Sequence, residues 1–394
     1  MNILIISQNF FSYAANTTCI KEIVSEIVKR GHSCRIVTRY GVIYDSSKND
    51  EYTPFPSNVN SNSQSIILTI IKKALTFFTW PLQPFENVSD FYYTVVEEYE
   101  RDTPDIIFAT CFTYTNLIVA SRIKKKYGDK VTYVAYFLDA IFCGQIPRMY
   151  SESLHDFMAL RAEKKVLYNA DKIVMMQAAQ SKYTKNRGKI PYYANIKFLD
   201  IPLYIPEKLK AEVMPISQDS VINFFFAGTM PKNIRDPHYI LELFNKLDDH
   251  DCYLKLAGRY DYKDVVDYYT TNNDHIIDLG LLSREDVESN MQNCDILVNI
   301  GNSVPNMAPS KIFEYMSTGK PLLTTIKVKS DRCRQYYDQY PNCLVLNEYD
   351  DVLYNFHKLC AFIMDIRSGK YREPISDNIF NDSKPSTLVD FLEI

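Results

Sequence analysis

Glycine is scarce in this sequence, with 11 in 394 residues, where an average usage of about 7% would give more than twice as many. Because glycine is rare here, the position of each one is informative. Gly228, Gly258, Gly280, Gly301 and Gly319 all lie in the C-terminal half, and the first four each follow a short apolar run. Glycine lets a ligand approach the backbone closely, so ligand-binding loops are expected in this half.

The sequence also lacks the signatures of zinc sites and membrane spans. Its nine cysteines include no Cys-x-x-Cys pair and no Cys/His cluster with zinc spacing. We therefore expect reduced, mostly buried thiols and a cytoplasmic protein. No stretch reaches the roughly 18 apolar residues of a spanning helix. The nearest approach, residues 65–80, is interrupted by Lys72 and Lys73.

No strong charge of one sign is present either. The formal net charge is -4, and acidic and basic residues are dispersed along the chain. A protein that binds nucleic acid usually shows a basic face or a basic tail. The sequence therefore argues against nucleic acid as a partner.

Strand-like and helix-like segments alternate in two rounds, which predicts parallel, doubly wound sheets. The first round has strand-like runs at 3–7, 34–38, 105–109, 131–137 and 172–176, with helical patterns at 16–30, 66–79, 87–101, 113–126, 152–169 and 178–187. The second round has strand-like runs at 221–227, 252–257, 275–279, 295–299, 321–325 and 343–346, with helical patterns at 236–246, 262–271, 283–291, 310–317, 331–338 and 350–367. The fold class is α/β, with two Rossmann-like domains.

The boundary between the two rounds falls in a stretch with little periodicity. Residues 195–219 contain three prolines, so the connection is expected there. We predict an N-terminal domain over 1–205, a linker over 206–219 and a C-terminal domain over 220–373. The tail, 374–394, has a short helical pattern at 386–392 that can pack back on the first domain.

The first candidate loop runs from Gly228 to Arg235, after an apolar strand. In an open parallel sheet, ligands bind at the carboxyl ends of the strands. Lys232 and Arg235 bring two cations to this end, just before a helix that we expect to start with Asp236 as N-cap and Pro237 as its first residue. Two such cations can neutralise a diphosphate. A surface loop with two solvated charges explains them equally well.

The second candidate loop runs from Gly301 to Ser310. Ser310 is expected to cap the next helix, and Lys311 opposes the helix dipole at the first position, which favours a docked anion. Glu314, about one turn further, can accept hydrogen bonds from two neighbouring hydroxyls, as on a ribose diol. The alternative is an ordinary exposed glutamate. A third segment, 317–321, is explained as a tight helix-to-strand turn at Gly319.

Residues 309–321 read Pro-Ser-Lys-Ile-Phe-Glu-Tyr-Met-Ser-Thr-Gly-Lys-Pro. This segment resembles the donor-binding motif of the retaining glycosyltransferases with the GT-B fold, the group 1, family 4-like enzymes. Residues 278–280 and 293–298 resemble two other segments of that group at fitting spacing, and residues 226–229 resemble its entry to the second domain. Gly31 and His32 resemble its N-terminal unit more weakly. The resemblance covers most of the chain and implies two domains that face each other across a cleft.

The resemblance implies a role for each candidate residue. Glu314 would bind the nucleotide ribose, while Lys232 and Arg235 would hold the diphosphate and stabilise it as a leaving group. The remaining donor contacts would come from Gly228, Thr229, Asn306, Pro309, Ser310 and Lys311. Such enzymes need no metal, because cations and a helix dipole supply the charge. We expect no cofactor other than the nucleotide sugar as co-substrate.

Two positions depart from the family pattern. The family commonly has a first glutamate eight positions before the one that matches Glu314, where this sequence has Asn306. Asparagine can still hydrogen-bond a sugar hydroxyl. A His-Asp-like pair often follows the strand that matches 131–137, where this sequence has Leu138 and Asp139. Asp139 is a candidate catalytic contact to the sugar or the acceptor, and a loop cap explains it as well.

The expected function is transfer of a sugar from a nucleoside diphosphate sugar, UDP-sugar favoured, to a glycan or lipid-linked glycan in bacterial surface polysaccharide synthesis. Retention of configuration follows from the resemblance only. Residues 65–78 could form a helix that rests on the inner face of a membrane, and packing on the first domain is the alternative. A nucleotide-sugar 2-epimerase and a non-catalytic nucleotide-sugar-binding subunit stay open as other functions.

Overall fold

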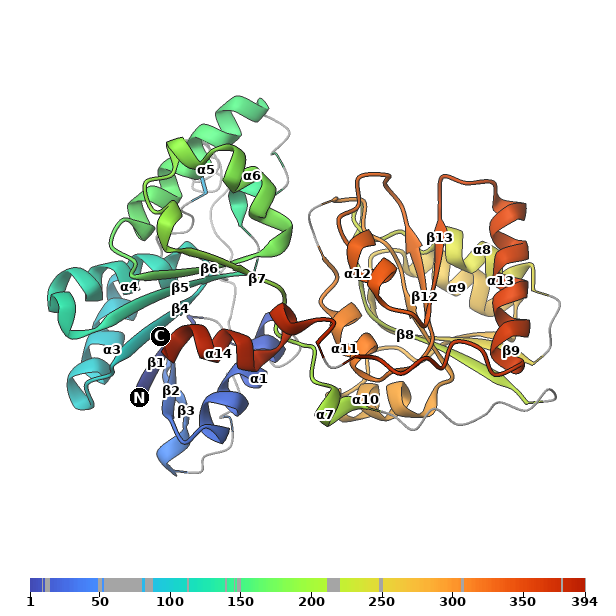
Figure 1. Ribbon diagram of the computed structural model, residues 1–394, viewed down its shortest axis with the longest axis horizontal. Helices are drawn as coiled ribbons and strands as arrows, with labels where there is room; N and C mark the ends of the chain where they lie inside the picture. The colour runs from blue at the N-terminus through green and yellow to red at the C-terminus, as the bar shows by residue number, and fades with distance from the viewer. Residues whose placement is uncertain are drawn as a thin grey trace, which may run out of the picture. The chain divides into compact units, whose positions relative to one another are not determined.

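The computed structural model describes most of the chain, in two compact units. The described residues are 1–8, 10, 15–48, 52, 80–81, 88–111, 113–138, 140–144, 146, 150–210, 220–247, 251–305, 308–376 and 378–393. The first unit is Met1–Pro202 together with Pro385–Ile394, and the second is Leu203–Lys384. Each unit has one sheet and its own apolar core (Figure 1).

The first unit is built on a seven-stranded sheet of order β3-β2-β1-β4-β5-β6-β7. Its strands are β1 (Asn2–Ile6), β2 (Ser33–Thr38), β3 (Gly41–Asp45), β4 (Ile106–Thr110), β5 (Thr132–Phe137), β6 (Lys172–Met176) and β7 (Ile196–Leu199). Neighbours are parallel except β2 and β3, which are antiparallel. The central strands are apolar on both faces because both faces are covered.

Helices supply that cover in the first unit. Val95, Leu117 and Ala159, from α3 (Val88–Arg101), α4 (Tyr114–Tyr127) and α5 (Glu152–Leu167), belong to one core cluster with alternate residues of the sheet. The short α6 (Gln180–Lys185) adds Tyr183 to that core. α1 (Ala15–Lys29) packs on β2, and Gly31 ends it with a φ of 79°.

The C-terminal helix α14 (Pro385–Glu393) belongs to the first unit and lies along α1 (Figure 1). It buries Leu388, Val389 and Leu392. Arg30, just after α1, lies 2.7 Å from a carboxylate oxygen of Asp390. Apolar burial and this ion pair hold the end of the chain against its beginning.

The second unit has a six-stranded, fully parallel sheet of order β10-β9-β8-β11-β12-β13. Its strands are β8 (Ile222–Met230), β9 (Cys252–Tyr260), β10 (Ile276–Asp278), β11 (Ile296–Asn299), β12 (Leu322–Ile326) and β13 (Cys343–Asn347). Its helices are α7 (Pro206–Leu209), α8 (His238–Asn245), α9 (Lys263–Asn272), α10 (Arg284–Asn293), α11 (Lys311–Ser317), α12 (Arg334–Gln339) and α13 (Val352–Arg367). The two sheets confirm the predicted doubly wound α/β fold.

Two strands of the first sheet were not predicted. β7 falls in the stretch 195–219 that was expected to be connection, and it is a short edge strand with only Leu199 fully buried. β3 pairs antiparallel with β2 and follows it after a two-residue turn. Both strands lie at sheet edges, where half-exposed residues give little hydrophobic signal.

Three local expectations in the second unit were wrong. β8 continues through Gly228 and Thr229 to Met230, so these residues are paired with β9 and are not part of a loop. α8 starts at His238, so Pro237 and not Asp236 occupies the cap position. The carboxylate of Asp236 still accepts from the backbone N–H of His238 at 3.0 Å. Ser310 stands at the expected cap position before Lys311, but it has helical dihedrals and its side chain makes no cap bond.

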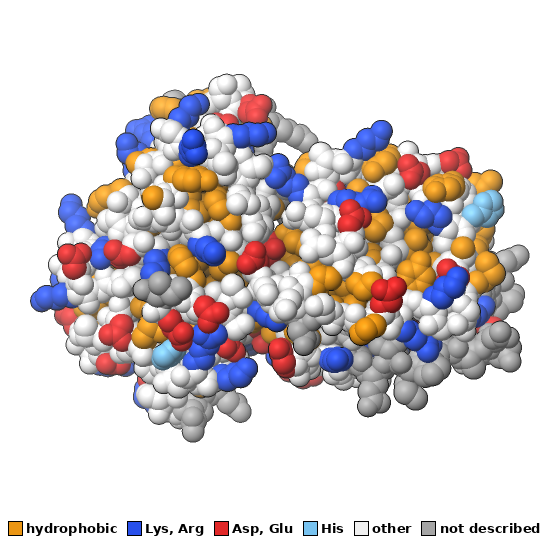
Figure 2. All heavy atoms as spheres, viewed as in Figure 1, with side chains coloured by type: hydrophobic (Ala, Val, Ile, Leu, Met, Phe, Trp, Pro, Cys, Tyr) orange, Lys and Arg blue, Asp and Glu red, His pale blue; other side chains and the backbone are white. Residues whose placement is uncertain are grey.

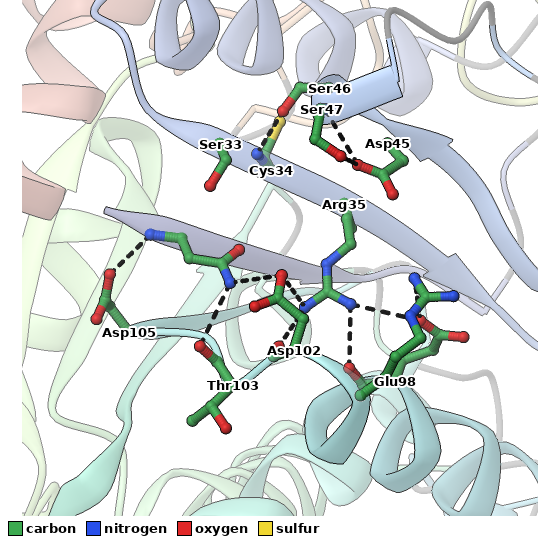
Figure 3. A network of polar contacts seen from close by, with 12 residues as sticks. Ser33, Cys34, Arg35, Asp45, Ser46, Ser47, Glu98, Asp102, Thr103 and Asp105 are labelled. Carbon is green, nitrogen blue, oxygen red and sulfur yellow. Dashed lines mark hydrogen bonds and ion pairs between the residues drawn. The ribbon is translucent and has the colours of Figure 1, made fainter.

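Figure 3 shows a polar network at the amino ends of the strands in the first unit. The buried Arg35 of β2 donates to the backbone carbonyl oxygen of Glu98 at 3.1 Å and lies 3.4 Å from the carboxylate of Asp102. The backbone N–H of Asn2 donates to the carboxylate of Asp105 at 2.7 Å. These bonds join β1, β2, β4 and the end of α3, at the edge opposite the one where parallel sheets bind ligands.

Charges of both signs are interspersed over the face drawn in Figure 2. This agrees with the small net charge of -4. Within the described ranges, no helix has the length and apolar character that a membrane span requires.

Candidate functional site

The carboxyl edge of the second sheet brings the candidate residues together. β8 lies between β9 and β11, so the chain reverses direction across the sheet at β8. Ligands in doubly wound sheets bind at this switch point. The loops that leave β8 and β11 meet there, because the backbone N–H of Ser303 donates to the carbonyl oxygen of Ile234 at 2.7 Å.

Arg235 fastens these two loops together. Its Nη1 donates to the carbonyl oxygen of Thr229 at 3.0 Å, and its Nε donates to Oδ1 of the buried Asn302 at 3.1 Å. A Cβ atom at Gly228 would lie 3.3 Å from the same guanidinium, so glycine makes room for it. Burial lowers the pKa of Arg235 from its ordinary value, but an arginine stays protonated in proteins.

Lys232 lies in the same loop but is exposed. Its backbone N–H donates to a carboxylate oxygen of Asp261 at 3.0 Å, which fixes the loop without using the side chain. Its ammonium makes no ion pair within the described part of the chain. The fixed backbone and exposed ammonium of Lys232 fit a contact to an anionic ligand and fit a solvated charge equally well.

Gly301 and Gly258 are explained by packing. A Cβ atom at Gly301 would lie 2.5 Å from the carbonyl oxygen of Thr325, and one at Gly258 would lie 1.8 Å from that of Gly228. Gly258 also has a φ of 149°, which side-chain-bearing residues rarely adopt. Their first role is therefore close strand packing at this edge.

Glu314 is buried, with 2% of its surface exposed, so it is not the ordinary exposed glutamate of the alternative explanation. Its Oε2 lies 2.7 Å from Nη1 of Arg284 and 3.0 Å from Nζ of Lys311. Burial by itself raises the pKa of Glu314, but the charges of Lys311 and Arg284 outweigh burial, and the pKa is lowered from its ordinary value. The carboxylate is therefore ionised at neutral pH.

The sequence did not single out Arg284. It stands at the first position of α10, whose cap Ser283 accepts from the backbone N–H of Asp286 at 3.0 Å. Acidic residues are preferred in a first helical turn, so an arginine at this position was a signal. Its partner Glu314 is 30 residues away in the sequence, which no local pattern reveals.

Tyr315 was also missed, although it lies inside the recognised motif. Its hydroxyl accepts from the backbone N–H of Ala227 at 2.8 Å and donates to the carbonyl oxygen of the same residue at 3.2 Å. Burial raises the pKa of Tyr315, so the hydroxyl stays neutral. These two hydrogen bonds fix α11, and with it Glu314, to β8.

Lys327 adds another cation at this edge, just after β12. Its Nζ lies 3.8 Å from Asp236 and 3.6 Å from Glu348. Burial raises the pKa of Glu348, although Lys327 opposes this effect. Thr325 Oγ1 donates to Glu348 at 2.8 Å and accepts from the backbone N–H of Gly301 at 2.9 Å. This chain of bonds fixes the loop after β11.

The remaining predicted site residues are less informative. Asp139 and Asn306 lie outside the described residues. Pro309 is buried and its carbonyl oxygen accepts from Ile312 at 3.2 Å, while Ser310 is half-buried. The helix expected at 65–78, for which contact with a membrane was one alternative, also lies outside the described residues.

Comparison with known proteins gives no match to a family model and none to a curated protein sequence. Solved structures do match. WaaG, a glycosyltransferase involved in lipopolysaccharide biosynthesis, has a TM-score of 0.60 at 14% identity, with 99% of each chain covered. The lipopolysaccharide outer core galactosyltransferase WaaB has a TM-score of 0.56 at 14% identity over both full chains. A UDP-N-acetylglucosamine 2-epimerase has a TM-score of 0.55 at 11% identity, covering 100% of this chain and 95% of its own. Likeness at such low identity concerns architecture, and it shows that this chain has the GT-B fold.

Proposed function

We propose that the protein is a glycosyltransferase that moves a sugar from a nucleoside diphosphate sugar, UDP-sugar favoured, to a glycan or lipid-linked acceptor. The observation that carries the proposal is the buried, ionised Glu314 at the carboxyl edge of the second sheet, within the motif at 309–321. A buried carboxylate needs hydrogen-bond donors, and ribose hydroxyls are donors. The GT-B fold of the lipopolysaccharide transferases WaaG and WaaB supports a role in bacterial surface polysaccharide synthesis.

In this proposal the cations of the edge serve the leaving group. The guanidinium of Arg235 is fixed by hydrogen bonds to Thr229 and Asn302, and Lys232 lies in the same loop. Together they would neutralise the diphosphate as the glycosidic bond breaks, which stabilises the transition state electrostatically. With this charge supplied by side chains, the reaction has no requirement for a metal. Departure and attack on the same face, with retention, is the proposed course.

The proposed acceptor side lies in the first unit, with Asp139 after β5 as its candidate residue. A lipid-linked acceptor would require contact with a membrane surface. Helix α5 offers a described surface for this, because Leu154, Phe157, Arg161 and Lys164 follow one another at helical spacing and are exposed. An apolar and basic stripe of this kind suits an anionic lipid surface. Co-sedimentation with anionic and neutral vesicles tests this, with Phe157→Ser as the variant and Tyr93→Ser, an exposed aromatic on α3, as the matched control.

The first test of the donor site is thermal stabilisation by UDP, GDP and ADP, with Glu314→Ala as the variant. A ligand at about 100 times its dissociation constant adds about 2.7 kcal/mol, which shifts a melting temperature by a few degrees. We expect a shift with one nucleotide, UDP first, and its loss in Glu314→Ala. A folded protein that shows no shift with any of the three at millimolar concentration would contradict the donor site.

Turnover then separates the candidate functions. A transferase releases UDP and labels an acceptor from a cell-wall extract, whereas an epimerase changes the sugar nucleotide without any acceptor. The epimerase is a second candidate because UDP-N-acetylglucosamine 2-epimerases share this fold over the whole chain. Binding without turnover in either assay would favour a non-catalytic subunit.

A further inference from the structure

The ion pair between Arg284 and Glu314 leaves hydrogen-bonding groups unused on both partners. Arg284 reaches Glu288 with Nε at 2.7 Å and Glu314 with Nη1 at 2.7 Å. Its third nitrogen, Nη2, is buried and has no hydrogen-bond partner. Buried guanidinium N–H groups without a partner are unusual, because each one loses its bonds to water without replacement.

The carboxylate of Glu314 is used on one side only. Both cations, Arg284 and Lys311, meet Oε2, and no contact among the described residues reaches Oε1. An ionised carboxylate can accept about four hydrogen bonds, two on each oxygen. The ion-paired residues therefore keep an acceptor on Glu314 and a donor on Arg284 that the pair itself does not use.

We propose that Arg284 recognises the nucleoside together with Glu314, so that the guanidinium and the carboxylate form one site for a vicinal diol. A hydroxyl both donates and accepts, so one ribose hydroxyl can donate to Glu314 Oε1 and accept from Arg284 Nη2. Arg284 also holds the carboxylate by Oε2, which orients the other oxygen. This inference rests on the proposed donor site at Glu314 and extends it to a residue on α10.

The structure explains why an arginine is suited to this position. Its Nε is fixed by Glu288 one turn along α10, so the planar fork is oriented before any ligand arrives. A lysine would supply the charge as a single point, without the fork. Arg284→Lys should therefore keep Glu314 ionised and the fold intact but weaken recognition of the diol.

The test compares UDP with its 2′-deoxy and 3′-deoxy forms, by calorimetric titration of the full chain. Arg284→Gln and Arg284→Lys are the variants. Arg334→Gln is the matched control, because Arg334 also starts a helix of this unit and pairs with the residue four positions on, Asp338, at 2.8 Å. Circular dichroism checks that each variant is folded.

We expect the wild-type protein and Arg334→Gln to bind UDP at least about tenfold more tightly than at least one of the deoxy forms. In both Arg284 variants the affinity for UDP should fall about tenfold, while that for the less favoured deoxy form should change by less than about threefold. An unchanged ratio of UDP to deoxy affinity in folded Arg284→Lys would overturn the role of Arg284 and leave the donor site standing. No binding of UDP, GDP or ADP by the wild-type protein would remove both.

Discussion

Two glutamates, one in each unit, are buried to the same degree and held in opposite ways. Glu163 on α5 is 0% exposed and Glu314 on α11 is 2% exposed. Glu163 accepts from the hydroxyl of Tyr192 at 2.7 Å and from that of Tyr183 at 2.8 Å, whereas Glu314 is paired with two cations. Burial raises the pKa of Glu163 to about 7 despite these hydroxyls, while the cations lower that of Glu314.

The difference shows that the partners, more than the burial, decide the charge of a buried carboxylate. Hydroxyls can donate to a carboxylate or accept from a carboxylic acid, so they suit either form of Glu163. Cations stabilise only the ionised form, so Glu314 remains an acceptor over the whole neutral range. The first arrangement suits a structural bond inside a core. The second suits a site that must offer an anion to a ligand.

The largest effect is expected for Glu314→Gln. The variant leaves Arg284 and Lys311 without their shared anion, and breaking a buried ion pair costs about 3 kcal/mol or more. We expect the lower part of that range, because both cations are partly exposed. Denaturant unfolding at pH 7 measures the loss, and the nucleotide-induced melting shift should vanish in the same variant. If Glu314→Gln were as stable as the wild type, the contacts of Glu314 with Arg284 and Lys311 would not contribute to the stability of the second unit.

Glu163→Gln should have the opposite effect on stability above neutral pH, where it is expected to stabilise the protein. The pKa of Glu163 is about 7 in the folded protein and about 4.3 in an unfolded chain. Between these values the folded state holds a proton that the unfolded state has released, so stability from this group is present at low pH and is lost as pH rises to 7. Glutamine does not titrate, so the variant does not undergo this fall in stability as the pH rises. Relative to the wild type, the variant should gain about 2.5 kcal/mol of stability between pH 5 and pH 8.

Melting curves of both proteins from pH 5 to pH 8.5 check this expectation. The informative quantity is the difference between the two at each pH, because other groups titrate in both. A difference that stays constant with pH would mean that Glu163 is already ionised at pH 5, and the contrast with Glu314 would then be lost.

The sequence predicts the fold better than it predicts this contrast. Alternating apolar segments locate the central strands and most helices, because each central strand is buried on both faces. The hydrophobic pattern does not predict β3 and β7, because they are half-exposed edge strands. The turn at Gly319, with a φ of 77°, follows from local chemistry and could be predicted.

The contacts of the site are harder to predict from the sequence, because they join segments that are far apart along the chain. Glu314 was identified from the family motif, but its burial and its bond to Arg284 depend on how α10 and α11 meet. Glu163 carries no local signal, since its partners Tyr183 and Tyr192 come from later segments that only the fold brings to α5. Arg235 could be named as a cation at the edge, but its bond to Asn302 needs the neighbouring loop.

A smaller effect is expected for Tyr192→Phe, which removes one donor to Glu163. Removing one partner of a buried hydrogen bond costs about 1–3 kcal/mol, and we expect the lower part of that range because Glu163 keeps Tyr183 as a donor. The loss should be larger at pH 8, where Glu163 is ionised, than at pH 5, where the carboxylic acid needs one donor fewer. Tyr193→Phe is the control at the next residue, because its hydroxyl lies 3.0 Å from that of the exposed Thr184. Equal losses in both variants would mean that the hydroxyl of Tyr192 does not support Glu163.

The smallest effect is expected for Arg334→Gln, which separates pairing from burial. Arg334 and Asp338 form an ion pair at 2.8 Å, as short as that of Arg284 and Glu314, but both side chains are about half exposed. Exposed pairs four residues apart on a helix contribute about 0.3–0.5 kcal/mol, because water and salt screen them. Denaturant unfolding at low and at high salt should show a loss of this size that shrinks as salt rises. A loss as large as that of Glu314→Gln would mean that a short arginine–carboxylate contact is enough by itself, and that burial is not what distinguishes the second unit's carboxylate.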